Sequence, residues 1–463
     1  MKSIPKPLLH DLLQQKHFVE SDFIAAHQLP PVTSVRLNPA KPARLYEAND
    51  SVPWCPLGRY LPERPVFTID PAFHAGAYYV QEASSMFLHH ILKQITTGKS
   101  RLRVLDLCAA PGGKSTLIAS VLDSECLLVS NEVIRSRATI LDENMTRWGY
   151  SNTFVTANDP RDFSALEGFF DVIVVDAPCS GSGLFRKDER ALNDWTESNV
   201  TLCWERQRRI LADILPALKT GGTLIYATCS YSFAEDEQIL DWLAQEFKMD
   251  SLPITLNNDW GIVSVSSPQH SIDGFRFYPD KVKGEGFFIA ALTKTNQTDG
   301  LKPSKFKSQN IRKIGEQVAG LINIPDAVYL KAANDEYFTV LAQHETDLQT
   351  LQKCLYLRKA GLRLGQPGQK DWIPAHDIAL SINVSANVPT LELNKLDAQH
   401  FLKKEDFAVQ SDIKGWRLIK YEGLGLGWVK LLGNRMNNYL PKNLRIRMEI
   451  NNSLYLEEET DML

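Results

Sequence analysis

A chain of 463 residues, of which 44% are hydrophobic, is long enough for roughly two to four domains with cores of their own. Its formal net charge of −4 excludes a protein that is basic over its whole surface, although it permits local basic faces. The seven cysteines are widely spaced and include no Cys-x-x-Cys pair. That spacing argues against a disulfide framework and a cysteine-rich metal site, and it fits a reducing compartment.

The first segment, MKSIPKPLLHDLLQQKH, has neither the apolar core nor the cleavage site of a secretory signal. No stretch approaches the roughly 18 uncharged apolar residues of a membrane span. We therefore expect a cytoplasmic, monomeric protein without a membrane span or a bound metal. Residues 1–100 are expected to form an N-terminal extension with a helical signal in AYYVQEASSMFLHHILKQI, where His89 and His90 would lie on the helix surface.

From residue 101 to 296 the sequence alternates between predicted strands and helices. The strands are the apolar, β-branched runs RVLDL, CLLVSNE, TFVTAND, FDVIVVDAP and GGTLIYATCS, followed by FRFYPD and GEGFFIAALT. Helices are predicted over 134–148, over about 200–218, and from near Ser232, where Ser232 and Glu235 have capping-box spacing. This alternation predicts an α/β fold with a doubly wound, mostly parallel, Rossmann-like sheet. The short link between the last two strands predicts an antiparallel hairpin at one edge.

The segment NQTDGLKPSKF at 296–306 has the composition of a linker. Beyond it we expect a small middle domain at 305–382 and a final RNA-binding domain at 383–463. Between 414 and 447 there is one acid, Glu422, and the basic residues are Lys414, Arg417, Lys420, Lys430, Arg435, Lys442, Arg445 and Arg447. Such a stretch suits phosphate contacts that position RNA, although an ordinary charged surface has the same composition.

The segment DLCAAPGGKST at 106–116 predicts a glycine turn between the first strand and a helix, where backbone amides can approach a ligand. Gly113-Lys114-Ser115 fits the end of a phosphate-binding P-loop, but Cys108 stands at the first glycine position of that motif. The glycine pattern of a dinucleotide site is absent. The third candidate ligand is S-adenosylmethionine. At the ends of the next two strands, Glu132 can hold ribose hydroxyls and Asp159 an adenine amino group. A single acid at a strand end is more typical of a solvated loop, but here acids stand at three successive strand ends.

Two cysteines each follow an apolar run that predicts a buried strand, Cys179 in FDVIVVDAPCSG and Cys229 in GGTLIYATCSYS. Ligands of parallel α/β sheets bind outside the carboxyl ends of the strands, so both thiols are placed where chemistry occurs. The two strands are the fourth and fifth predicted strands, which are neighbours in the usual strand order of a doubly wound sheet. Adjacent strands lie ~4.8 Å apart. Two ordinary buried cysteines remain the alternative explanation.

The combination of DLCAAPGGK (106–114), Glu132, DAPCSGSG (176–183) and ATCS (227–230) closely resembles the Sun-type RNA cytosine-5 methyltransferases. The segments FRFYPD (275–280) and GEGFFIA (284–290) resemble the closing motif of that family. RLNP (36–39) and YVQEASS (79–85) extend the resemblance over about 30–293. The C-terminal part resembles the extended bacterial members of the RsmF type, which act on small-subunit ribosomal RNA and end in a PUA-like module.

The resemblance implies methylation of carbon 5 of a cytosine in 16S ribosomal RNA within the 30S subunit, with S-adenosylmethionine as methyl donor. Cys229 would add to carbon 6 of the base, Cys179 would assist release, and the extension at 1–100 would bind RNA. Apart from the resemblance, Asp176 can hydrogen-bond ring nitrogen 3 when it is protonated or shares a proton. The residues implied to contact S-adenosylmethionine are Cys108, Ala109, Ala110, Pro111, Gly112, Gly113, Lys114, Glu132, Asp159 and Asp176. Arg186 and Lys187 are expected to hold the phosphate beside the target base, unless they form a solvated basic loop.

Other functions fit parts of the same pattern. The enzyme can act on another RNA, such as tRNA. A DNA cytosine-5 methyltransferase would use Pro178-Cys179 as its nucleophile, but Ser180 stands where Gln is expected and a second cysteine would be superfluous. A non-catalytic ribosome-assembly factor has no use for an intact set of Cys229, Cys179 and Asp176.

Overall fold

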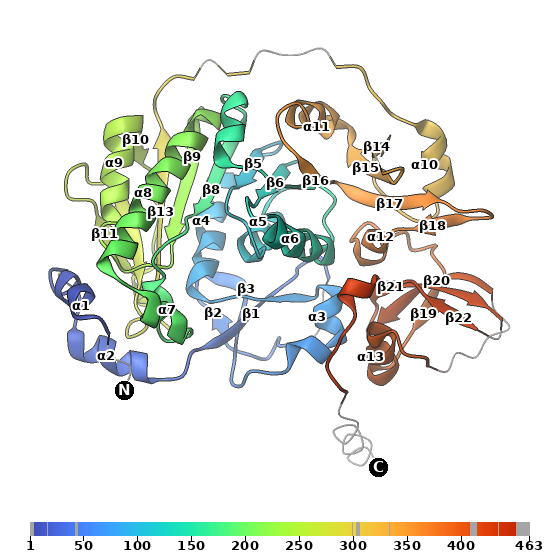
Figure 1. Cartoon of the computed structure of the whole chain (residues 1–463), viewed down its shortest axis with the longest axis horizontal. Helices are drawn as coiled ribbons and strands as arrows, with labels where there is room; N and C mark the ends of the chain where they lie inside the picture. Colours follow the sequence, from blue (N-terminus) through green and yellow to red (C-terminus); the bar gives the residue numbers. More distant parts are fainter. Residues whose placement is uncertain are drawn as a thin grey trace.

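The structure is a computed structural model of the chain, and it describes residues 4–15, 17–41, 45–298, 300–301, 306–332, 334–407, 414–433 and 435–450. Figure 1 shows a central sheet with the N-terminal extension beneath it and the C-terminal units beside it. Within the described ranges, no helix combines the length and apolar character needed to cross a bilayer.

A largely parallel sheet forms the centre of the molecule. Its strands between residues 103 and 294 are β5 (Arg103–Asp106), β6 (Leu127–Asn131), β7 (Thr153–Thr156), β8 (Phe170–Asp176), β9 (Leu218–Thr228), β10 (Met249–Ser251), β11 (Val263–Ser266), β12 (Asp273–Phe277) and β13 (Phe287–Lys294). Strands β7, β6, β5, β8 and β9 are parallel neighbours in that order, and β13, β12 and β11 continue the sheet antiparallel beyond β9. The predicted α/β fold and the hairpin of β12 and β13 are confirmed, with β11 rather than the hairpin at the edge.

Helices cover both faces of this sheet because its strands are apolar on each side. One face carries α4 (Phe87–Thr96), α5 (Gly113–Val121) and α6 (Arg135–Trp148), and the other carries α8 (Glu197–Ile214) and α9 (Glu237–Phe247). Successive residues of β5 serve the two faces: Val104 packs in the cluster with α4 and α5, and Leu105 packs in the cluster with α8 and α9. Both side chains are fully buried, so each face holds a separate part of the core.

The helix predictions differ from the structure mainly in where the helices begin. Helix α6 lies over the predicted range, whereas α8 begins three residues earlier than about 200, at Glu197, where the Thr196 hydroxyl accepts a hydrogen bond from the backbone N–H of Asn199. The third helix, α9, begins at Glu237 rather than near Ser232. The expected capping box is wrong, because the Glu235 carboxylate accepts hydrogen bonds from Ser180 and Ser230 instead.

The N-terminal extension is a small antiparallel sheet flanked by helices. Its elements are α1 (Lys6–Leu12), α2 (Glu20–Gln28), β1 (Thr33–Leu37), β2 (Ser51–Val52), β3 (Cys55–Leu61), η1 (Phe67–Ile69), α3 (Pro71–Ala75), β4 (Tyr78–Val80) and η2 (Ser84–Met86). The predicted helix over AYYVQEASSMFLHHILKQI is correct only from Phe87, because its first residues form β4 and pair with β1. His89 of that helix is 7% exposed and lies in the core, not on the helix surface as expected.

The middle unit is joined to the central sheet by a strand. It consists of α10 (Arg312–Val318), β14 (Ala327–Lys331), β15 (Tyr337–Leu341), η7 (Ala342–His344), α11 (Glu345–Leu351), β16 (Leu357–Ala360), β17 (Leu362–Pro367) and β18 (Trp372–Pro374). Strands β14, β15, β17 and β18 form the small sheet of this unit, whereas β16 pairs antiparallel with β7 of the central sheet, with Leu357 opposite Thr156. The central sheet therefore continues into the middle unit. The predicted linker at 296–306 falls partly outside the described residues.

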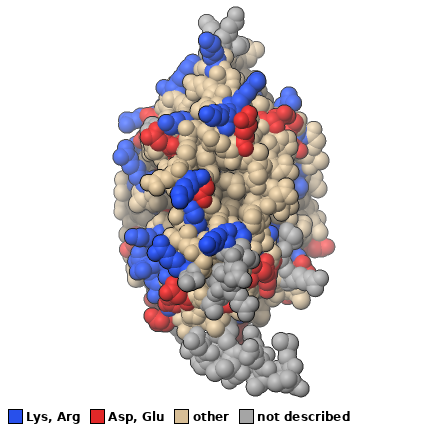
Figure 2. Space-filling view, turned by 90° about the vertical axis from the view of Figure 1, so that its right-hand side faces the viewer, with Lys and Arg blue, Asp and Glu red and all other residues tan. Residues whose placement is uncertain are grey.

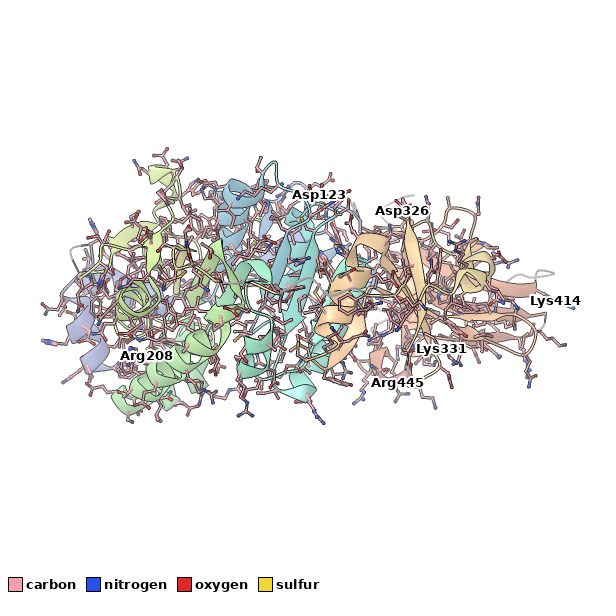
Figure 3. The ribbon with its side chains drawn as sticks, turned by 90° about the horizontal axis from the view of Figure 1, so that it is seen from above. Asp123, Arg208, Asp326, Lys331, Lys414 and Arg445 are labelled. Atoms are coloured by element: carbon pink, nitrogen blue, oxygen red, sulfur yellow. The ribbon has the colours of Figure 1, made fainter. Side chains whose placement is uncertain are left out.

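The last unit packs against the N-terminal extension. Its elements are α12 (His376–Leu380), β19 (Thr390–Glu392), α13 (Lys395–Lys403), β20 (Lys414–Tyr421), β21 (Leu424–Leu432), β22 (Met436–Asn438) and η8 (Lys442–Leu444). Val35 and Tyr78 of the extension share one buried cluster with Phe401 and Val429 of the last unit. Figure 3 shows the central sheet followed by the C-terminal units in a row, with Lys414 at the far end.

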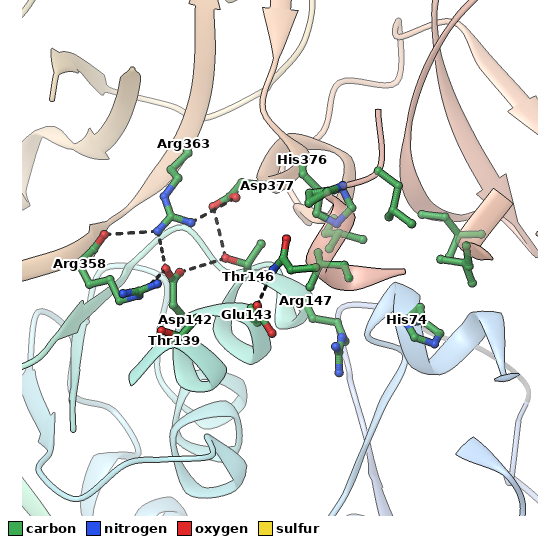
Figure 4. Close-up of a pocket in the computed structure, with 17 residues that line it drawn as sticks. His74, Thr139, Asp142, Glu143, Thr146, Arg147, Arg358, Arg363, His376 and Asp377 are labelled. Atoms are coloured by element: carbon green, nitrogen blue, oxygen red, sulfur yellow. Dashed lines mark hydrogen bonds and ion pairs between the residues drawn. The ribbon is translucent and has the colours of Figure 1, made fainter. Parts of the chain in front are cut away.

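Ion pairs hold the central, middle and last units together where they meet (Figure 4). Asp142 of α6 lies 2.6 Å from Arg363 and 3.2 Å from Arg358, and Asp377 of α12 lies 2.7 Å from Lys359. Asp142, Arg358, Arg363 and Asp377 line a cavity of about 200 Å³ at this junction. Charged groups of opposite sign face one another in the cavity, so it has the character of a structural contact between units.

Candidate cofactor and catalytic site

The glycine turn after β5 lies where the sequence predicts it. Gly112 has a φ of 116°, in the left-handed region that favours glycine, and α5 begins at the next residue. The loop is fixed from outside: Ala109 donates its N–H to the Asn131 carbonyl at 2.8 Å, Arg137 donates to the Ala110 carbonyl at 2.8 Å, and Asn144 donates to the Pro111 carbonyl at 2.8 Å. The backbone of residues 108–114 is therefore held in place before any ligand binds.

Asp106 precedes this loop at the end of β5, and only one of its two carboxylate oxygens accepts a hydrogen bond from a described residue. Its side chain is fully buried, and Oδ2 accepts a hydrogen bond from the Ser115 hydroxyl at 2.6 Å. Within the part of the chain that the structure describes, Oδ1 has no hydrogen-bond partner. Burial raises the pKa of this carboxyl to about 7. An unpaired buried oxygen next to a ligand-binding loop is suited to a donor group supplied by a ligand.

A pocket of about 310 Å³ opens beside the loop at the ends of β6 and β7. Of the residues expected to contact the cofactor, Cys108, Glu132 and Asp159 line it. The pocket also has apolar walls, which come from Leu107, Val133, Ile134, Pro160, Pro178 and Ile210. Glu132 is 2% exposed, and its Oε1 accepts a hydrogen bond from the backbone N–H of Ile134 at 2.9 Å.

The residues of this pocket fit S-adenosylmethionine. The flat apolar walls suit an adenine ring, and the carboxylates of Glu132 and Asp159 can accept hydrogen bonds from hydroxyl and amino groups. Three arginines, Arg137, Arg206 and Arg209, also line the pocket, and Arg137 pairs with Glu132 at 3.4 Å, so the pocket carries charges of both signs. Its apolar walls and carboxylate acceptors favour the third of the candidate ligands.

The two predicted cysteines meet at the ends of neighbouring strands. β8 and β9 are parallel partners, and the Sγ atoms of Cys179 and Cys229 lie 3.0 Å apart just beyond them. The hydrogen bond with Cys229, together with burial and the charge of Cys229, raises the pKa of the Cys179 thiol. When one of the two sulfurs is a thiolate, the other therefore keeps its proton. Pro178, beside Cys179, also lines the cofactor pocket, so the thiols adjoin that pocket.

Lys114 and Asp176 form an ion pair at the same edge of the sheet. The Lys114 Nζ lies 2.7 Å from Asp176 Oδ2 and 5.1 Å from the centre of the Phe287 ring. Burial acts to lower the pKa of Lys114, but the charges of Asp176 and Asp106 outweigh it and raise that pKa, so the ammonium form persists. The structure thus brings together Cys179, Cys229, Asp176 and Lys114.

Arg186 is not available to a phosphate, contrary to the sequence-based expectation. Its side chain is 4% exposed and forms an ion pair with Glu285 at 2.9 Å, and it donates a hydrogen bond to the Gly284 carbonyl at 2.7 Å. The arginine therefore ties the loop after Cys179 to the loop before β13. Lys187 next to it is exposed, so its predicted phosphate contact stays a prediction.

Sequence reasoning missed Glu235, which touches both cysteine-bearing loops. Its side chain is fully buried. Oε1 accepts from the Ser180 backbone N–H at 2.7 Å, and Oε2 accepts from the hydroxyls of Ser180 and Ser230, each at 2.6 Å. The one signal in the sequence is the run Glu235-Asp236-Glu237, three acids that directly precede the apolar positions of a buried helix.

Comparisons with known proteins cover most of the chain. Residues 95–293 match the family model described as 16S rRNA methyltransferase RsmB/F, residues 5–83 match the N-terminal domain of 16S rRNA methyltransferase RsmF, and residues 388–446 match the methyltransferase RsmF PUA domain. The chain is 30% identical over 457 residues to ribosomal RNA small subunit methyltransferase F of Shewanella piezotolerans, covering 92% of this chain and 94% of that protein. The protein of the same name from Psychromonas ingrahamii is 30% identical over 456 residues, with 91% of this chain and 93% of that protein covered.

Solved structures support the same fold. A methyltransferase homologue from Pyrococcus horikoshii is 28% identical, with a TM-score of 0.51, and the match covers 63% of this chain and all (100%) of that one. NSun6 from the same organism, solved with SFG, is 20% identical, with a TM-score of 0.53 over 64% of this chain and 100% of that one, which shows a common fold.

Proposed function

The chain belongs to the family of ribosomal RNA small subunit methyltransferase F, and on that premise we propose that it methylates carbon 5 of a cytosine in 16S ribosomal RNA through a covalent cysteine adduct. The observation that carries the proposal is the Cys179–Cys229 pair, 3.0 Å apart, beside the Lys114–Asp176 ion pair and the cofactor pocket. An enzyme that methylates an exocyclic amine or a hydroxyl has no need of two adjacent thiols.

S-adenosylmethionine is the methyl donor, and when bound it supplies an electrophilic methyl group. We assign the ribose hydroxyls to Glu132 and the adenine amino group to Asp159, because both carboxylates line the pocket. The backbone of the loop from Cys108 through Ala109, Ala110, Pro111, Gly112 and Gly113 to Lys114 would hold the remainder of the molecule. The Asp106 oxygen that lacks a partner among the described residues is a further acceptor for it.

The chemistry begins at Cys229. Its thiolate adds to carbon 6 of the cytosine, and the electrons of the 5,6 double bond make carbon 5 nucleophilic enough to take the methyl group. Negative charge develops on the pyrimidine ring during this addition. The Lys114 ammonium, held by Asp176, stabilises that charge, and Asp176 binds ring nitrogen 3 through a proton that the two groups share.

Cys179 is suited to the second half of the reaction. Once Cys229 has bonded to carbon 6, its sulfur no longer carries the negative charge that raises the pKa of the Cys179 thiol. Cys179 can then lose its proton to water, and its thiolate can accept the proton from carbon 5. The electron pair of that C–H bond re-forms the 5,6 double bond, and Cys229 leaves carbon 6 as a thiolate. The close contact of the two sulfurs thus orders the steps: attack by Cys229 comes first and release through Cys179 follows.

The target base must leave its stack to reach these thiols, since carbon 6 is inaccessible within a helix. We propose that the last unit and the extension position the RNA through phosphate contacts. Lys and Arg side chains lie in several groups on the face formed by the C-terminal units, with acidic side chains between them (Figure 2). Lys430 is paired with Asp371 at 2.8 Å, which makes it a weaker candidate for phosphate binding than a cation of the 414–447 stretch without such a carboxylate partner.

The test is methyl transfer from labelled S-adenosylmethionine to purified 30S subunits, to naked 16S ribosomal RNA and to tRNA, followed by mapping of the modified base. The proposal requires 5-methylcytosine at a single position of 16S ribosomal RNA. Methylation confined to tRNA would show that the substrate of the enzyme is tRNA and not 16S ribosomal RNA. Binding to 30S subunits with no methyl transfer to any of these RNAs would favour an assembly factor.

A further inference from the structure

We propose that Glu235 is a positioning residue that fixes the spacing of the two cysteines by binding both of their loops with one carboxylate. The inference rests on the proposed function, because it assigns Glu235 to the same reaction. Glu235 is fully buried and does not itself line the cofactor pocket. Its effect on catalysis would therefore pass through Cys179 and Cys229.

The hydrogen bonds of Glu235 reach the residue next to each cysteine. Ser180 follows Cys179, and it donates to Glu235 twice, through its backbone N–H at 2.7 Å and its hydroxyl at 2.6 Å. Ser230 follows Cys229, and its hydroxyl donates to the same carboxylate at 2.6 Å. A movement of either loop relative to the other would break at least one of these bonds.

The carboxylate itself is held in one orientation. Gln207 of α8 donates to Glu235 Oε1 at 3.3 Å and to the Pro178 carbonyl at 3.1 Å, so it ties the carboxylate to the residue before Cys179. Tyr226 of β9 donates from its hydroxyl to the Glu235 backbone carbonyl at 2.7 Å. Both partners are fully buried, and rigid partners of this kind are what a reactive pair needs for constant geometry.

Charge explains why a carboxylate occupies this position. Four donors converge on two oxygens, and an ionised carboxylate accepts at both oxygens, whereas an amide accepts at only one. Bonds to a charged acceptor are shorter and stronger than bonds between neutral groups, which suits a buried clamp. The neighbouring Asp236 and Glu237 form ion pairs with Arg276, and Asp236 also accepts a hydrogen bond from the Thr228 hydroxyl at 2.6 Å, at the end of β9. Glu235 differs from both in that its carboxylate joins the Cys179 loop to the Cys229 loop.

The test compares Glu235→Ala and Glu235→Gln with Asp377→Asn. Asp377 is the matched control, because it is also buried, at 6% exposed, and its partner Lys359 lies at the junction with the middle unit. The first readout is kcat and the KM for S-adenosylmethionine. The second is made on RNA-free protein: diamide takes two electrons and two protons from the thiols of Cys179 and Cys229, and mass spectrometry follows the disulfide that forms.

We expect Glu235→Ala to lower kcat by about 10²-fold with an unchanged KM, because small misplacements of reacting groups cost about that much. The disulfide should form more slowly in the same variant. For Glu235→Gln, kcat and the rate of disulfide formation should lie between those of Glu235→Ala and the wild type, since the amide oxygen of glutamine keeps an acceptor for Ser180. Asp377→Asn should leave both readouts close to wild type.

A wild-type rate of disulfide formation in Glu235→Ala would overturn the inference, as would an equal loss in Asp377→Asn, which would show general destabilisation. If Glu235→Ala does not fold, Ser180→Ala and Ser230→Ala each remove one hydroxyl. Ser230→Ala should then slow disulfide formation more, because Ser180 retains its backbone bond, and equal effects would contradict the clamp. Disulfide formation needs no RNA, so failure of the proposed methylation and failure of the clamp remain separate results.

Discussion

The sulfur atoms of Cys179 and Cys229 lie 3.0 Å apart although 50 residues separate them in the chain. Parallel pairing of β8 with β9 brings their carboxyl ends together, and each cysteine follows shortly after one of those ends. Neither cysteine is part of a disulfide, so both thiols are free to react. This contact predicts different outcomes when each cysteine is removed alone.

Replacing Cys229 by alanine removes the proposed nucleophile. Methyl transfer to 16S ribosomal RNA should fall by about 10³-fold or more, because carbon 5 of cytosine is not nucleophilic until a thiolate has added to carbon 6. Affinity for S-adenosylmethionine should stay at the wild-type level, since Cys229 does not line the cofactor pocket. Isothermal titration calorimetry and methyl transfer on the same preparation measure the two quantities. Full activity in this variant would assign the attack to another residue.

Replacing Cys179 by alanine should trap the enzyme on its RNA. The proton on carbon 5 would lack its acceptor, so the bond between Cys229 and carbon 6 would persist and a band of protein joined to RNA would survive denaturing electrophoresis. Cys354→Ala is the control, because Cys354 is a partly buried free cysteine of the middle unit. A stable adduct from Cys229→Ala, with none from Cys179→Ala, would exchange the two roles.

Replacing Glu132 by alanine should weaken the binding of S-adenosylmethionine and leave the contact between the two thiols unchanged. Glu132 is 2% exposed and lines the pocket, and loss of hydrogen bonds to two hydroxyls would raise the Kd for S-adenosylmethionine by ~10–100-fold. The rate of diamide-driven disulfide formation should be unchanged. Glu143→Ala supplies a control carboxylate, because Glu143 of α6 lies outside this pocket and accepts a hydrogen bond from Asn443 of the last unit. An unchanged Kd for Glu132→Ala would place the ribose elsewhere.

The strands and the meeting of the cysteines follow from local sequence, because apolar runs define the strands and parallel strands share one carboxyl edge. Arg186 was misplaced because its partner, Glu285, lies 99 residues further along the chain, and nothing near Arg186 indicates burial. Glu235 was misassigned for a similar reason. Its spacing from Ser232 fits a capping box, but Ser180, 55 residues earlier, supplies the hydrogen bonds that form instead.

The pairing of β16 with β7 was also beyond sequence reasoning. The run that becomes β16, Leu357–Ala360, is short and contains Arg358 and Lys359, so it does not read as part of a buried sheet. In the folded chain, ion pairs stabilise its two charged side chains: Arg358 pairs with Asp142, and Lys359 pairs with Asp377. Such complementarity across units depends on three-dimensional contacts that no local pattern contains.

His89 should make the fold sensitive to mild acid. Burial, followed by the charge of Lys93, lowers the pKa of His89 to about 4, whereas histidine in an unfolded chain has a pKa of ~6.5. Between these values the unfolded chain binds a proton that the folded chain does not, so the free energy of unfolding falls as the pH drops below ~6.5 and the loss is complete near 4. We expect this single group to contribute up to about 2–3 kcal/mol to that loss. Urea unfolding at a series of pH values measures it.

The matched variant for this effect is His89→Gln, which keeps a polar side chain of similar size but cannot take up a proton in this range. Its free energy of unfolding should depend less on pH between ~6.5 and ~4 than that of the wild type, even if it is lower at neutral pH. His90→Gln on the same helix serves as the control, because His90 is less buried and bonds the Thr255 carbonyl near the surface. Identical pH profiles for wild type and His89→Gln would mean that His89 is not the group whose protonation destabilises the core.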